Sequence, residues 1–162
     1  MAGEIINLFP AHRTYVEVFG GAGWVLFKKE PSEFEVYNDL NGDLVNLFRV
    51  AKHRQAEFYE QMNLHLYSRQ NYYDFKNGKD KDGDELARAL RFYYLIKTSF
   101  GSSITGGWGF SKKKNAKLFV DKEFLFQVSE RLKRVYIDNR SFETALKLYD
   151  SPETLFYLDP PY

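Results

Sequence analysis

The 162-residue chain contains no cysteine, which excludes disulfide bonds and thiolate metal sites. It also lacks an apolar run of about 18 residues, so no membrane-spanning helix is expected. The first residues lack the charged start and apolar centre of a signal peptide. The histidines, His12, His53 and His65, show no metal-ligand spacing, and no metal site is expected. These absences make the cytoplasm the expected location.

The net charge is only +1, but the charges are unevenly distributed along the chain. Residues 69–117 contain eleven Lys or Arg and five Asp or Glu, a local charge of +6, so the remainder carries −5. A basic segment on an acidic body predicts a surface that faces a polyanion. The alternative is a Lys-rich loop that is merely solvated.

The alternation of β-forming runs, glycine turns and helical periodicity predicts an α/β protein. Strands are expected at residues 15–19, 35–38, 134–138 and 155–158, the last of them buried. Helices are expected at residues 24–29, 41–66, 85–100, 121–133 and 142–149, with residues 4–9 as a helix tail that ends before Pro10. Asp121 and Ser141 are candidate N-caps for the last two helices. Because helices separate the strands, the sheet should be parallel.

The α/β pattern is interrupted between residues 68 and 118. Residues 68–84 combine aromatic side chains with Lys, Asp and Gly, which indicates a mobile, charged connector. Residues 101–117 are too rich in glycine for a helix and predict a hairpin or an irregular loop. We therefore expect three parts: residues 1–67 and 119–162 form an α/β body, and residues 68–118 form a basic, aromatic insertion.

A glycine-rich turn, Phe19-Gly20-Gly21-Ala22-Gly23, follows the first predicted strand. Glycines allow the turn to tighten and a ligand to approach the backbone. Asp39 ends the next strand, where a carboxylate can accept two ribose hydroxyl hydrogens. Together these features predict an adenosine-containing ligand. A plain turn, and an N-cap role for Asp39, are the alternatives.

The full dinucleotide fingerprint is absent, because Trp24 stands where its final glycine would be. A bulky side chain at that place argues against a pyrophosphate on the helix start. S-adenosylmethionine has no phosphate and satisfies this restriction.

The sequence Asp159-Pro160-Pro161-Tyr162 follows the last predicted strand. In open α/β sheets, ligands bind beyond the carboxyl ends of the strands. The Asp159 carboxylate and the Pro160 carbonyl can accept both amino hydrogens of an adenine, which makes the N6 lone pair available. Tyr162 can stack on the base, a contact that contributes about 1–3 kcal/mol. A simple turn is the alternative for this tetrad in isolation.

The turn at residues 19–23, the segment Asn38-Asp39-Leu40-Asn41 and the tetrad at residues 159–162 occur in the order seen in DNA adenine-N6 methyltransferases of the Dam type, which the chain resembles over nearly its whole length. The resemblance implies a Rossmann-like fold, S-adenosylmethionine as methyl donor with S-adenosylhomocysteine as product, and an adenine flipped out of double-stranded DNA. The residues it assigns to cofactor binding are Phe19, Gly21, Gly23, Asp39 and Phe142. Those it assigns to the target adenine are Asp159, Pro160 and Tyr162. Residues 95–110 resemble the stretch near DNA, and the lysines expected at phosphates are Lys112, Lys113, Lys114 and Lys117.

Two departures from the family pattern modify these expectations. An Asp-Phe pair often follows the third strand in the family, whereas this chain has Ser141-Phe142, with Asp138 as a substitute for the missing acid. Phe142 can equally serve only as a packing residue between helix and sheet. Relatives also extend beyond the tetrad, so we expect a partial sheet of four strands with the last strand at an edge.

The partial sheet leaves three further alternatives. The chain can be a fragment of a longer protein. Alternatively, another chain completes the sheet, either the second half of a split enzyme or a second copy of this chain in a homodimer. A non-catalytic DNA-binding remnant is the principal rival to an enzyme, and a methyltransferase for RNA or protein amides is a third possibility. Asp rather than Asn at position 159 argues against the last of these.

Overall fold

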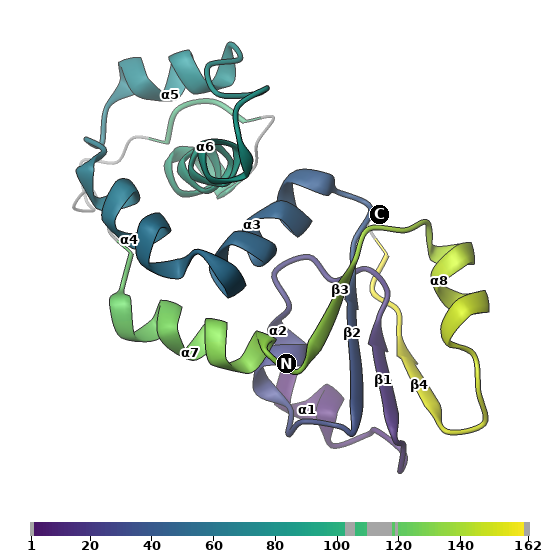
Figure 1. Cartoon of the computed structure of the whole chain (residues 1–162). Coiled ribbons are helices and arrows are strands. Elements are labelled where there is room, and N and C mark those ends of the chain that lie inside the picture. Colours follow the sequence, from purple (N-terminus) through teal and green to yellow (C-terminus); the bar gives the residue numbers. More distant parts are fainter. Residues whose placement is uncertain (1, 103–105, 110–117, 119, 161–162) are drawn as a thin grey trace. The chain divides into compact units, whose positions relative to one another are not determined.

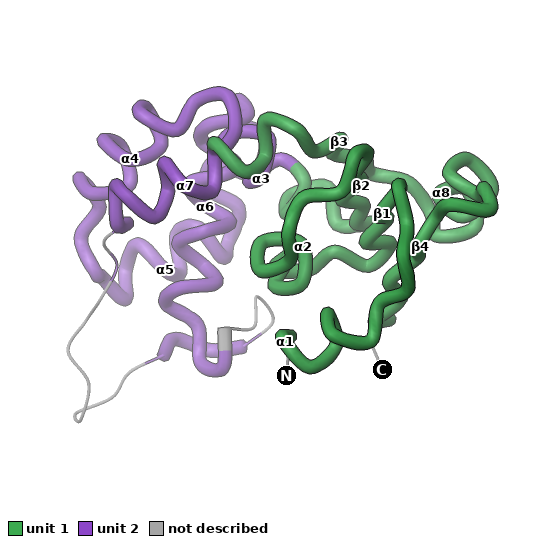
Figure 2. The backbone as a smooth tube through the Cα atoms, turned by 90° about the horizontal axis from the view of Figure 1, so that it is seen from below, with its two compact units in different colours: residues 1–45, 130–162 green, residues 46–129 purple. Residues whose placement is uncertain are grey.

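The computed structural model describes residues 2–102, 106–109, 118 and 120–160. They form two compact units, shown in Figure 2. Unit 1 comprises residues 1–45 and 130–162, and unit 2 comprises residues 46–129. Among the described helices, none is long and apolar enough to cross a bilayer.

Unit 1 is built on a parallel four-stranded sheet (Figure 1). Its strands are β1 (Thr14–Glu17), β2 (Phe34–Asn38), β3 (Val135–Asp138) and β4 (Thr154–Tyr157). The strand order is β3-β2-β1-β4, and Val16 of β1 lies opposite Val36 of β2 and Phe156 of β4. The predicted α/β class, the parallel sheet of four strands and the edge position of the last strand are confirmed.

Helices cover both faces of this sheet. On one face Val16, Val18 and Val36 pack with Ala145 of α8 (Phe142–Tyr149). Because successive residues of a strand point to opposite faces, Glu17 points the other way. There its Oε2 accepts a hydrogen bond from the Leu26 amide of α2 (Trp24–Lys28) at 2.9 Å. The short helix α1 (Ala2–Ile6) contacts α2.

The prediction that the last strand is buried was wrong, because every residue of β4 is only partly buried. An edge strand has a paired neighbour on one side only. An apolar run in the sequence does not show this position, so it predicts more burial than the strand has. The hydrogen-bond pairing of β4 with β1 extends past the strand, since the Val18 amide donates to the Tyr157 carbonyl at 3.2 Å.

Unit 2 is helical and contains its own apolar core. Its complete helices are α4 (Gln55–Leu64), α5 (Arg69–Lys76) and α6 (Glu85–Thr98). The helices α3 (Gly42–His53) and α7 (Lys122–Leu132) continue from one unit into the other. The largest buried side chains of the core are Phe58, Met62, Tyr72, Phe75 and Tyr94.

The single long helix predicted over residues 41–66 is two helices, α3 and α4. They are separated at Arg54, whose backbone angles are φ −131° and ψ 33°. The Arg54 guanidinium binds the Glu57 carboxylate in the first turn of α4. Neither proline nor glycine marks this break, so the helical propensity of the sequence does not reveal it.

The connector predicted over residues 68–84 is partly a helix, α5. Ser68 caps it, accepting a hydrogen bond from the Asn71 amide, and Tyr72 and Phe75 are buried. The predicted helix over residues 85–100 is confirmed as α6, capped by Asp84.

The predicted hairpin or loop at residues 101–117 lies largely outside the described residues. The described residues in and next to this segment form a short 3-10 turn, η1 (Phe100–Ser102), and an antiparallel bridge between Ser99 and Trp108. The predicted caps of the last two helices are confirmed. Asp121 accepts from the Phe124 amide at 2.8 Å, and Ser141 accepts from the Thr144 amide at 3.4 Å.

Candidate functional site

The residues predicted to bind cofactor and target base follow the carboxyl ends of the four strands. Phe19–Gly23 follows β1, Asp39 follows β2, Phe142 follows β3 and Asp159 follows β4. Because the strands are parallel, these four segments leave the same edge of the sheet. Since β1 lies between β2 and β4, its turn is flanked by Asp39 on one side and by Asp159 on the other. This edge is where open α/β sheets bind ligands.

The glycine turn adopts a conformation that side chains would hinder. Gly21 and Gly23 have φ angles of 51° and 67°, in the left-handed region that favours glycine. A Cβ atom at Gly20 would lie 2.2 Å from the Tyr37 ring, so that ring packs directly against the turn. The Tyr37 hydroxyl donates to the Gly21 carbonyl at 2.6 Å. A Cβ atom at Gly21 would meet no atom within 4 Å, so there is space for a ligand next to the backbone at this residue.

Asp39 is hydrogen-bonded to the glycine turn, with which it was predicted to bind an adenosine-containing ligand. Its Oδ2 accepts from the Gly21 amide at 2.9 Å, and its Oδ1 accepts from the Asn41 amide at 2.8 Å. The N-cap of α3 is instead Asn41, whose Oδ1 accepts from the amides of Asp43 and Leu44. The N-cap interpretation of Asp39 was therefore wrong. Each carboxylate oxygen of Asp39 retains acceptor capacity for a ligand hydroxyl.

Phe19 and Phe142 lie together at the ends of β1 and β3. Their ring centroids are 5.8 Å apart with an interplanar angle of 34°, and Phe142 is 45% exposed. Ser141 serves as the cap of α8. Asp138 accepts from the Tyr149 hydroxyl at 2.7 Å and from Arg140 Nε at 3.0 Å. Both residues considered in place of the family's acid thus have intramolecular partners.

Asp159 and Pro160 are exposed beyond the end of β4. Tyr162, the fourth residue of the tetrad, lies outside the described residues. So do the four lysines predicted to face phosphates, which are Lys112, Lys113, Lys114 and Lys117. Their predicted roles remain predictions.

Glu17 is a buried acid beneath this edge that the sequence interpretation missed. Glu17 is 2% exposed, and its Oε2 accepts hydrogen bonds from the Tyr15 hydroxyl at 2.7 Å and from the Leu26 amide. Burial raises the pKa of the Glu17 carboxyl to about 7; the two hydrogen bonds oppose this rise and the charge of Asp159 adds to it. An acidic residue inside an apolar strand, just before a glycine turn, was the available signal.

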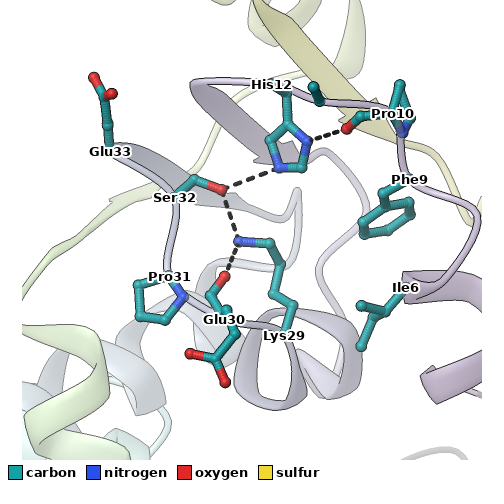
Figure 3. A pocket seen from close by; sticks show the side chains of 10 residues that line it. Ile6, Phe9, Pro10, His12, Lys29, Glu30, Pro31, Ser32 and Glu33 are labelled. Carbon is teal, nitrogen blue, oxygen red and sulfur yellow. Dashed lines mark hydrogen bonds between the residues drawn. The ribbon is translucent and has the colours of Figure 1, made fainter.

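A separate hollow lies at the opposite, amino end of the strands (Figure 3). Its volume is about 470 Å³, and residues 9–12 and 29–33 form most of its wall. The polar groups there bind one another: the Lys29 ammonium donates to Ser32 Oγ at 2.9 Å and to Glu35 at 2.5 Å. Ser32 Oγ also lies 3.1 Å from His12 Nε2. None of the predicted site residues that the structure describes lines this hollow.

Comparison with known proteins identifies the family of the chain. The family model of the D12 class N6 adenine-specific DNA methyltransferases matches residues 1–162. A type II methyltransferase, M1.LlaDCHI, from Lactococcus lactis subsp. cremoris is 30% identical over 91% of this chain and 56% of its own length. The DNA adenine methylase of Escherichia coli K12 is 24% identical over 98% of this chain and 59% of its own length.

A DNA adenine methylase from Serratia marcescens is 23% identical over the full chain and 62% of its own length. The chain therefore spans about three-fifths of the length of these relatives. The family match, in contrast, extends over every residue, including the glycine turn, Asp39 and the tetrad. On this evidence the chain belongs to the family of D12 class N6 adenine-specific DNA methyltransferases.

Proposed function

We propose that this chain is the catalytic core of a site-specific DNA methyltransferase that transfers a methyl group from S-adenosylmethionine to N6 of an adenine flipped out of duplex DNA. The observation that carries the proposal is the common sheet edge, at which the glycine turn, Asp39 and Asp159 follow neighbouring parallel strands. Membership of the adenine-specific family supports the same assignment.

The residues that would hold the cofactor are Phe19, Gly21, Gly23, Asp39 and Phe142. Their arrangement fits an adenosine: Gly21 borders open space, Asp39 offers carboxylate acceptors to a ribose, and Phe142 presents a partly exposed ring. The exposed Trp24 in place of a helix-start glycine suits a ligand without a pyrophosphate. When bound, S-adenosylmethionine supplies an activated methyl group, and S-adenosylhomocysteine is the product.

Asp159 and Pro160 would orient the target adenine. The Asp159 carboxylate and the Pro160 carbonyl accept the two N6 hydrogens, which favours a nitrogen whose lone pair is available for attack. Tyr162 would stack on the base. Such positioning of two reactants can lower a barrier by about 7–11 kcal/mol, and no covalent enzyme intermediate is required.

Asp159→Ala tests the proposal directly. Tritiated S-adenosylmethionine and an adenine-containing duplex are incubated with wild-type and variant chains, and label in the DNA is counted. The wild type should transfer methyl groups, whereas the variant should lose transfer by at least about 100-fold and retain cofactor affinity in calorimetry, since its glycine turn is unchanged.

Asp150→Ala is the matched control. Asp150 is also an exposed aspartate next to β4, but it precedes the amino end of that strand. This control should transfer methyl groups at the wild-type rate. A wild-type chain without transfer, or normal transfer by Asp159→Ala, would contradict the proposed function.

A further inference from the structure

A buried asparagine lies among the segments that carry the proposed cofactor residues. Asn38, the last residue of β2, is 1% exposed. Its side-chain amide donates to the Val18 carbonyl at 2.9 Å and to the Arg140 carbonyl at 3.1 Å. Its Oδ1 accepts from the Arg140 amide at 2.9 Å. One side chain thus connects the ends of β1, β2 and β3.

We propose that Asn38 is a positioning residue of the cofactor site, because it holds together the three strand ends from which the proposed cofactor-binding residues emerge. Val18 directly precedes Phe19, Arg140 lies two residues before Phe142, and Asn38 itself precedes Asp39. This inference rests on the proposed function.

Main-chain bonds extend the same network into the glycine turn. The carbonyl of Asn38 accepts from the Gly20 amide at 2.8 Å, and the Asp39 amide donates to the Asp138 carbonyl at 3.4 Å. The side chain of Asn139 donates to the Asp39 carbonyl at 2.7 Å. A shift at position 38 would therefore move the turn and Asp39 together.

The carboxamide group has the donor and acceptor combination that this position requires. Both of its N–H groups face carbonyl oxygens, and its oxygen faces an amide N–H. An ionised carboxylate in its place has no donor and would face two carbonyl oxygens at close range. Since buried polar groups without partners are costly, the three strand ends would separate.

Asn38→Asp is the near-isosteric test, and Asn46→Asp is its matched control. Asn46 is also a buried asparagine, 4% exposed, and its Nδ2 donates to the Glu85 carbonyl at 2.8 Å within unit 2. Calorimetry with S-adenosylhomocysteine at pH 8 should show an affinity loss of about tenfold or more in Asn38→Asp. Asn46→Asp should lower the Tm but leave the affinity within about twofold.

A second readout depends on protonation of the introduced carboxyl group. A protonated carboxyl can donate one of the two lost hydrogen bonds, so the affinity of Asn38→Asp should recover several-fold from pH 8 to pH 6. The titratable groups near this side chain, Asp39, Asp138, Arg140 and Tyr149, are present in the wild type as well, as is Glu17 on the opposite face of the sheet. The ratio of variant to wild-type affinity at each pH therefore isolates the new group.

The outcomes separate this inference from the proposed function. If the wild type fails to bind S-adenosylhomocysteine, the proposed function is contradicted, and the role of Asn38 with it. If the wild type binds and folded Asn38→Asp binds equally well at pH 8, only the role of Asn38 is overturned. Should Asn38→Asp not fold, Asn38→Ser takes its place. Its affinity for S-adenosylhomocysteine should fall about threefold, while its Tm decrease should be similar to that of Asn46→Asp. Unchanged affinity in Asn38→Ser would equally overturn the inference.

Discussion

Individual side chains at the carboxyl edge of the sheet restrain the backbone of the glycine turn and of the neighbouring strand ends. Asp39 holds the Gly21 amide, the Tyr37 hydroxyl holds the Gly21 carbonyl, and the Asn38 side chain connects three strand ends. The glycine turn is therefore restrained before any cofactor binds. A preformed site loses less conformational entropy on binding than a mobile one.

Glu17 provides a pH prediction. Its pKa is about 7 in the folded chain against 4.5 as the ordinary value, so between these pH values the folded state keeps a proton that the unfolded state releases. The contribution of Glu17 to the free energy of unfolding should therefore fall as the pH rises through this window, by up to ~3 kcal/mol, and stay constant above it. Glu17→Gln cannot ionise and should lack this decrease.

Urea unfolding of wild type and Glu17→Gln from pH 4.5 to pH 8 measures the difference. Glu143→Gln, which alters a glutamate in the exposed first turn of α8, is the control and should follow the wild-type curve. Parallel curves for wild type and Glu17→Gln would show that the buried carboxyl has an ordinary pKa.

Among the helices, those with strong end signals were predicted well, and those shaped by packing were not. Asp121 and Ser141 cap α7 and α8 as predicted, and α6 begins at the predicted Glu85, where the structure adds Asp84 as its cap. The helix α5 was missed because its neighbouring Lys, Asp and Gly residues resemble a connector. Its cap and the burial of Tyr72 and Phe75 stabilise it nonetheless.

The cap of α5 gives a stability prediction. Ser68 Oγ accepts from the Asn71 amide at 3.3 Å, and Ser68→Ala removes this acceptor. The free energy of unfolding should fall by about 1 kcal/mol. Urea denaturation monitored by circular dichroism measures this loss, and Ser68→Asp, which restores an acceptor, should recover most of it. Equal stability of Ser68→Ala and wild type would show that packing alone maintains the helix.

For the chain as a whole, the proposed site residues and the basic segment belong to different units. The residues proposed for cofactor and target base belong to unit 1, whereas the basic segment at residues 69–117 belongs to unit 2. We therefore expect unit 2 to supply most of the electrostatic attraction to DNA. Phosphate contacts of this kind weaken with salt, because binding releases counterions.

Replacement of Lys112, Lys113, Lys114 and Lys117 by alanine tests this expectation. If all four contact phosphates, the slope of log K against log salt should become shallower by about three to four. Fluorescence anisotropy with a labelled duplex at several salt concentrations measures the slope. Lys28→Ala with Lys147→Ala, two exposed lysines of unit 1, is the control and should leave it near the wild-type value. An unchanged slope in the quadruple variant would indicate that these lysines are only solvated.

Local signals in the sequence were sufficient for the class of the fold, its four parallel strands, and the helix caps at Asp121 and Ser141, whereas the binding roles of Asp39 and Asp159 stay predictions. These signals act over a few residues: glycine permits unusual backbone angles, a capping side chain satisfies nearby amides, and an apolar period indicates a buried face. No local signal marks the break at Arg54, and the partial burial of β4 and the raised pKa of Glu17 depend on the position of each residue in the folded sheet. The Asn38 network shows why such features escape a local pattern, since it joins residues 102 positions apart that become neighbours only when β2 and β3 pair.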